Sequence, residues 1–183
     1  IDMTPMSDVM TLLLCFFMLT STFLTPEPVK VNTPSSVSEV KVPENDVLNI
    51  LVSPEGNIYV GSENKNTMQE MMDEVTDKWG VSLNATQLKN FREDAMIGAP
   101  IAVLADYYSL DPEKMAEEIQ KLSIPLDSVD GKMSEFQDWV KAARNSNPDI
   151  RIAVKCDGNT PYAVVKKMMS ELQDMNENRY QLI

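Results

Sequence analysis

The chain has 183 residues, which corresponds to one domain or to one small domain with an appendage. Its 28 acidic and 16 basic residues give a formal net charge of −12, so a phosphate backbone would be repelled and we expect no nucleic-acid partner. The absence of histidine and the presence of two cysteines exclude His-dependent nucleophilic catalysis, imidazole zinc sites and four-thiolate metal sites. We therefore expect no bound metal and no cofactor.

Residues 9–24 form an apolar run without a charged residue. A helix over residues 5–25 would be about 31 Å long, which matches the hydrocarbon core of a bilayer, so we expect one transmembrane helix in contact with lipid. Thr4 is expected to cap this helix, Pro5 suits its first position, and Pro26 should end it. A cleaved signal peptide fits less well, because no basic residue precedes the run and no small-residue cleavage site follows it.

The orientation of this helix does not follow from charge. The first basic residue is Lys30, so the positive-inside rule cannot be applied to this helix. Because the sequence begins with Ile1 rather than Met, we also expect residues before it.

Asp8 lies one turn inside the predicted membrane helix. An ionised carboxylate at the bilayer centre costs about 2.5 to 3.5 kcal/mol, so an acid within a membrane helix indicates a function in proton or ion handling. The alternative is that Asp8 lies at the membrane interface and interacts with the positive end of the helix dipole. The residues alone leave both interpretations open.

Small, polar and methionine side chains follow Asp8 along one side of the helix at a 3-4-3-4 spacing. Such a side usually contacts another helix rather than lipid, so we expect partners that shield Asp8. The predicted membrane-helix interface consists of Thr4, Pro5, Thr11, Cys15, Met18 and Thr22.

Residues 26–46 are rich in Pro, Ser and Val, which predicts an extended, semi-rigid linker. Alternating valines in this linker are able to add a strand to a partner, although a solvated tether explains the composition equally well. The candidates for pairing are Val29, Val31, Asn32 and Pro34.

Residues 47–183 are predicted to form a small α+β domain. Residues 47–53 and 57–60 flank a Pro-Glu-Gly turn and predict a hairpin. The patterns that follow the central region predict a helix, a strand, a second helix and a closing strand, which lie at residues 133–144, 150–155, 161–175 and 179–183. The resulting order, β-β-α-β-α-β, is that of a small α+β layer.

Residues 61–132 interrupt this pattern with about three helices. Apolar residues from Met68 to Trp79 repeat at helical spacing, Asn84 with Gln87 predicts a capping box, and Asp111-Pro112 opens a further helix. This helical insertion would either form a subdomain with its own core or cover a face of the domain for a specific partner.

The first helix resembles the membrane anchor of the ExbD/TolR family. Asp2, Thr4, Pro5 and Asp8 fall in order on that family's signature, in which Asn or Asp precedes Thr-Pro and a membrane acid follows three residues later. The sequence VKVNTPSS from Val29 resembles the family's Val-x-Val-Asn-x-Pro segment, and the Lys-Cys-Asp turn at residues 155–157 resembles its basic-x-Asp turn. The resemblance covers residues 1–60 and 133–183.

The resemblance implies a single-pass protein of a bacterial inner membrane, with a cytoplasmic N-terminus and a periplasmic C-terminal domain. It implies that the helix lies inside a pentameric ring of ExbB/TolQ-type subunits with a second copy of the chain, and that Asp8 carries the proton. The expected function is an energy-transducing motor that uses the proton motive force to drive a TonB- or TolA-like protein in outer-membrane transport. A gliding or secretion apparatus would need the same machinery. A single carboxylate favours protons over sodium as the transported ion but does not decide between them.

Other classes of protein remain open at this point. A membrane-anchored periplasmic module that binds peptidoglycan or a protein, without ion translocation, would tolerate Asp8→Asn. A flagellar-type stator is less favoured because the chain has no OmpA-like peptidoglycan motif. An enzyme is disfavoured because no acidic or basic residues fall at the spacing of a catalytic pair.

Overall fold

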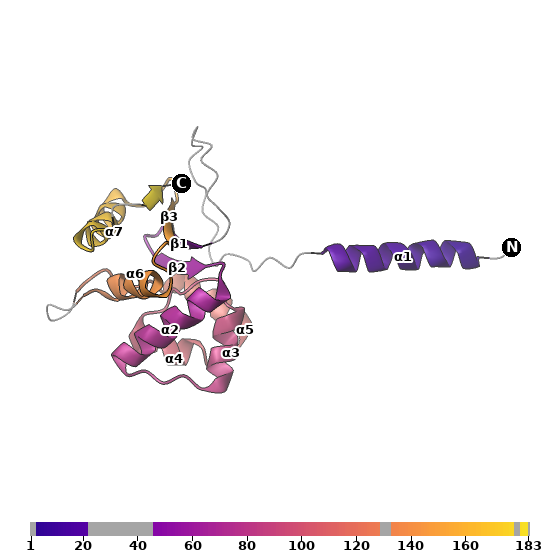
Figure 1. Cartoon of the computed structure of the whole chain (residues 1–183), viewed down its shortest axis with the longest axis horizontal. Helices are drawn as coiled ribbons and strands as arrows, with labels where there is room; N and C mark the ends of the chain where they lie inside the picture. The colour runs from indigo at the N-terminus through magenta and orange to yellow at the C-terminus, as the bar shows by residue number, and fades with distance from the viewer. Residues whose placement is uncertain (1–2, 22–45, 129–132, 178–179, 183) are drawn as a thin grey trace.

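The computed structural model describes residues 3–21, 46–128, 133–177 and 180–182. They form a separate N-terminal helix and a mixed α+β domain (Figure 1). The α-helices, β-strands and 3₁₀ turns (η) are, in chain order, α1 Thr4–Thr20, β1 Val47–Val52, β2 Ile58–Ser62, α2 Lys65–Trp79, α3 Ala85–Glu93, η1 Ile101–Val103, α4 Leu104–Tyr107, α5 Pro112–Glu118, η2 Ile119–Lys121, α6 Glu135–Ser146, β3 Arg151–Cys156, α7 Tyr162–Asp174 and β4 Tyr180–Leu182.

Helix α1 occupies the predicted apolar segment but differs from the expectation at its ends. It begins at Thr4, so Met3 is the N-cap and the predicted cap by Thr4 is wrong. Its 17 residues end at Thr20, five residues before the predicted end. Among the described helices, none combines the length and the apolarity needed to cross a membrane. Linker residues 26–45 and Pro26 lie outside the described residues.

The four strands form one sheet in the order β2-β1-β3-β4. The predicted hairpin is confirmed, with β1 and β2 antiparallel around Gly56, whose φ of 90° suits a residue without a side chain. Strand β3 then pairs in parallel with β1, and β4 pairs in parallel with β3. Each parallel pair is joined through a helical connection, as such pairs require.

Helices α6 and α7 are the two helices predicted from the C-terminal half. A capping box formed by Ser134 and Gln137 starts α6, which buries Phe136, Trp139 and Val140. The Ser134 hydroxyl donates to the Glu171 carboxylate of α7 at 2.9 Å, so the two helices lie next to each other. Buried strand residues complete the same core: Leu48, Ile50, Val52, Ile152 and Val154.

The insertion contains the three predicted helices, α2, α3 and α5, and also the short elements η1, α4 and η2. Their buried side chains belong to the same hydrophobic core as those of the sheet and α6, which excludes a subdomain with its own core. Helix α2 lies along α6, where the nearly fully buried carboxylate of Asp138 accepts from Lys78 at 2.5 Å and from the Trp79 indole at 2.9 Å. Figure 1 shows the insertion helices gathered beside β2.

Residues 94–98 of the insertion close the outer edge of β2. Ile97 and Val60 exchange two backbone hydrogen bonds of 2.7 and 2.9 Å, in an antiparallel bridge. Two glycines permit this approach, because a Cβ on Gly98 would lie 2.3 Å from the Tyr59 ring and a Cβ on Gly61 would lie 2.7 Å from the Ala95 carbonyl oxygen. The β-β-α-β-α-β order alone would leave this edge of β2 open, and the insertion covers it.

Candidate functional site

The candidate site is Asp8, which lies one turn into helix α1. It is the only charged residue in the described segment 3–21, and this segment contains no basic residue to neutralise it. Every residue of α1 is exposed, and the exposed large apolar side chains surround the helix: Met3, Met6, Val9, Met10, Leu12, Leu13, Leu14, Phe16, Phe17, Met18 and Leu19. A helix that is apolar on all sides is stable when lipid or other protein covers it.

Two hydroxyl groups of α1 bond to the helix itself. The Thr11 hydroxyl donates to the Ser7 carbonyl oxygen at 2.8 Å, and the Thr20 hydroxyl donates to the Phe16 carbonyl oxygen at 2.8 Å. Such bonds to the preceding turn satisfy the hydroxyl donors without water. Ionised Asp8, in contrast, carries acceptor positions on both carboxylate oxygens that need donors or water.

The predicted interface residues Thr4, Pro5, Thr11, Cys15 and Met18 all lie on α1, whereas Thr22 lies outside the described residues. Thr11, Cys15 and Met18 follow Asp8 at helical spacing. Their contact with a partner helix stays a prediction.

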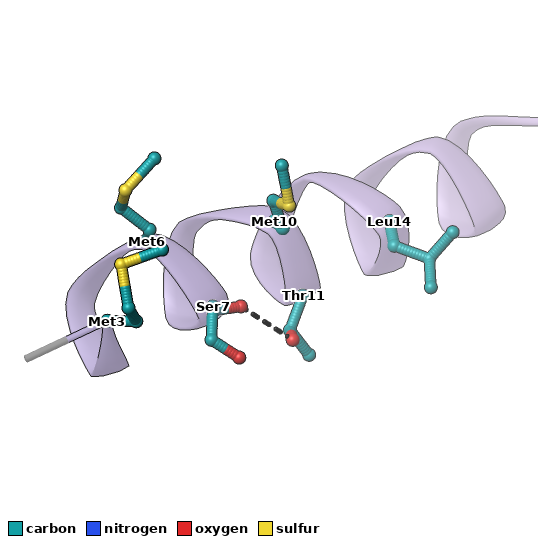
Figure 2. A pocket seen from close by; sticks show the side chains of 6 residues that line it. All are labelled: Met3, Met6, Ser7, Met10, Thr11 and Leu14. Carbon is teal, nitrogen blue, oxygen red and sulfur yellow. Dashed lines mark hydrogen bonds between the residues drawn. The ribbon is translucent and has the colours of Figure 1, made fainter.

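A shallow hollow lies on another side of α1 (Figure 2). Three methionine side chains border it, and Ser7 and Thr11 supply its polar atoms. Asp8 does not line it. Sequence analysis missed this hollow, although the spacing of its residues was available as a signal: Met3, Met6, Ser7, Met10, Thr11 and Leu14. Thr11 belongs both to this hollow and to the residues that follow Asp8 at helical spacing, so the two features adjoin each other on α1.

The proposed pairing residues Val29, Val31, Asn32 and Pro34 lie outside the described residues, so this expectation also stays a prediction.

The turn after β3 is structural. The buried Asp157 carboxylate accepts from the backbone and the side-chain amide of Asn159 at 2.9 and 3.1 Å, and the Asp157 N–H donates to the Val52 carbonyl oxygen. Burial raises the pKa of the neighbouring Cys156 thiol, which makes it a poorer nucleophile. This turn therefore fixes α7 to the end of β1. Within the described residues, no His, Cys, Asp and Glu side chains gather as metal ligands.

A family model described as Biopolymer transport protein ExbD/TolR matches residues 1–183, the whole chain including the insertion. No curated protein and no solved structure matches the chain.

Proposed function

Because the chain belongs to the ExbD/TolR family of biopolymer transport proteins, we propose that it is the ion-carrying subunit of an inner-membrane energy-transducing motor. In this proposal α1 is the membrane-embedded part, the α+β domain lies in the periplasm, and Asp8 carries the proton. The observation that carries the proposal is a single carboxylate on a helix that is otherwise uncharged and is surrounded by exposed apolar side chains.

Membrane insertion of α1 is supported by its surface and its internal hydrogen bonds. The 17 residues extend about 26 Å, a few ångströms less than a typical hydrocarbon core. Thr11 and Thr20 keep their hydroxyl donors satisfied without water. A surrounding ring of ExbB/TolQ-type subunits and a second copy of the chain would cover the exposed side chains and shield Asp8.

The mechanism follows from the charge of Asp8. In its protonated form Asp8 is neutral and tolerates an apolar neighbour, whereas in its ionised form it needs polar groups or water. Asp8 would take up a proton from one side of the membrane and release it to the other. Each change of charge changes the neighbouring surface that Asp8 favours, from apolar to polar and back, and α1 moves accordingly. Each elementary charge that crosses the membrane supplies about 2.3 kcal/mol per 100 mV, which is enough to bias such a movement.

The periplasmic domain would pass this movement to a TonB- or TolA-like protein that serves outer-membrane transport. Its shared core supports this function, because close packing of the sheet, α6 and the insertion in one core allows them to transmit a displacement. The linker would connect that unit to α1.

The test is Asp8→Asn in cells that depend on outer-membrane uptake. We expect uptake to be lost while the protein level and co-purification of the ring subunit are unchanged, because Asn is close to Asp in shape but does not titrate. Asp8→Glu should retain measurable uptake, and Asp73→Asn, at an exposed position of α2, should behave as wild type.

Proteoliposomes that contain the ring subunit provide the direct readout. Proton flux driven by a membrane potential should be present with wild type and absent with Asp8→Asn. Normal uptake and flux in Asp8→Asn would refute the proposal and favour a membrane-anchored binding module.

A further inference from the structure

Strand β1 is the first element of the domain after the linker, and it lies inside the sheet. It pairs with β2 on one side over five residues and with β3 on the other side over six. Five of its six side chains are buried, which shields its backbone hydrogen bonds from water. A force that reaches the domain through the linker therefore enters a strand that is bonded along both edges.

Both ends of β1 are also fixed by hydrogen bonds. At the entry, the Asp46 carbonyl oxygen accepts from the Arg151 N–H of β3 at 3.0 Å. At the exit, the Ser53 carbonyl oxygen accepts at 2.9 Å from the hydroxyl of Thr160, which lies in the turn between β3 and α7. The attachment of β1 to the β3 side of the sheet thus extends beyond the strand at each end.

The direction of a force decides how this attachment resists it. Strands β1 and β3 are parallel, so both start at one end of the sheet and both finish at the other. A force that pulls the start of β1 against the end of β3 acts along the strands and loads all hydrogen bonds of the ladder together. A force that pulls the start of β1 away from the start of β3 acts across the ladder and breaks its bonds one after another. The first arrangement resists more, because bonds that are loaded together share the force.

The C-terminal end of the domain lacks this support. Strand β4 has three residues, and β3 is its single neighbour in the described sheet. Leu182, near its end, is 60% exposed. The chain therefore connects α1 to the strand with two long ladders and leaves the weakly held strand at the other terminus (Figure 1).

We propose that β1 is the force-carrying strand of this chain: a pull that enters from the linker at Asp46 is held in shear along β1 and passed to the turns at the opposite end of the sheet. This inference rests on the proposed function of the domain, which is to pass on the movement of α1. It assigns a role to Thr160, whose hydroxyl ties the turn after β1 to the turn after β3.

Forced unfolding of the full-length chain in detergent tests this role, because it is governed by the unfolding rate rather than by equilibrium stability. One handle is attached to the exposed thiol of Cys15 on α1, in a Cys156→Ala background that leaves no other native thiol. The second handle is placed on Gly158→Cys, just after the end of β3, or on Asp149→Cys, just before its start. Both positions are exposed, and a Cβ on Gly158 meets no atom within 4 Å. Circular dichroism checks that each variant is folded.

The two chains differ in which end of β3 is pulled. We expect a higher unfolding force for Gly158→Cys, which loads the β1–β3 ladder in shear, than for Asp149→Cys, which opens it from one end, at the same loading rate. Equal forces, or a lower force for Gly158→Cys, would overturn the proposal. The measurement needs no ring subunit and no membrane potential, so its failure is distinguishable from a failure of the function proposed for Asp8.

Thr160→Val tests the fixed exit of β1. We expect it to lower the unfolding force of the Gly158→Cys chain and to leave that of the Asp149→Cys chain unchanged, because opening from the start of the strands reaches Thr160 last. A purely structural role would lower both forces together, which would contradict the proposal, as would an unchanged force in the Gly158→Cys chain. Thr86→Val, at an exposed position of α3, is the matched control and should change neither force.

Discussion

Gly98 occupies a position where even one methyl group does not fit. Its Cβ would lie 2.3 Å from the ring of Tyr59, a residue that is fully buried and whose hydroxyl donates to the Ile119 carbonyl oxygen at 3.1 Å. We predict that Gly98→Ala lowers the free energy of unfolding by about 1 to 3 kcal/mol, the usual cost of overpacking a core. Urea denaturation followed by tryptophan fluorescence would measure it.

Gly158 provides the matched control, because nothing lies within 4 Å of its Cβ position. Gly158→Ala should therefore keep the wild-type denaturation midpoint within a few tenths of a kcal/mol. If both alanine variants unfold at the same urea concentration, the close approach of Gly98 to Tyr59 does not limit stability.

Single residues were predictable from the sequence where the reason for them is local. The Asn84–Gln87 capping box was predicted from a spacing of three residues, and the Gln87 side chain does accept from the Asn84 N–H at 2.6 Å. Gly98 gave no such signal, because its environment comes from Tyr59, which the chain brings close only on folding. The cap by Thr4 was wrong by one residue, since the helix already includes Thr4.

At the scale of elements, the contact of α2 with α6 depends on one carboxylate. Asp138 is 2% exposed at its side chain, and it accepts from Lys78 and Trp79 at the end of α2. We predict that Asp138→Ala destabilises the domain by about 1 to 3 kcal/mol, because two donors lose their common acceptor and both are able to recover only partly through water. Thermal unfolding monitored by circular dichroism would detect the change.

Asp77→Ala serves as the control for this prediction. Asp77 lies next to Lys78 on α2 but is exposed, so its removal should leave the transition temperature close to that of wild type. An Asp138→Ala variant as stable as Asp77→Ala would mean that the apolar contacts alone hold α2 against α6.

Elements with a clear period were predicted well, and short ones were not. Helix α6 buries Phe136, Trp139 and Val140 as its pattern indicated. The four-residue helix α4 and the turn η1 have too few residues to show a period, and the pattern from Met115 to Leu122 hid a change from α-helix to a 3₁₀ turn at Ile119.

For the whole molecule, the order of strands and helices was predictable but the position of the insertion was not. The β-β-α-β-α-β order followed from periodicity, and the sheet order β2-β1-β3-β4 agrees with it. The sequence left open whether residues 61–132 form a core of their own, because amphipathic helices show which side is apolar but not what covers it. In the structure they share the core of the sheet and α6 and also close the β2 edge.

This shared core predicts that the insertion is required for folding, whereas α1 is not. Replacing residues 63–127 with a short Gly/Ser linker would remove the buried side chains that the insertion contributes to the shared core, at about 1.5 to 3 kcal/mol for each large side chain, and would leave β2 as an open edge. The loss is comparable to the whole stability of a domain, about 5 to 15 kcal/mol, so we expect no cooperative thermal transition and no near-ultraviolet dichroism. Removal of residues 3–21, none of which is buried, should leave the transition of the domain unchanged. A cooperative transition without the insertion would instead show that the sheet, α6 and α7 fold as an independent unit.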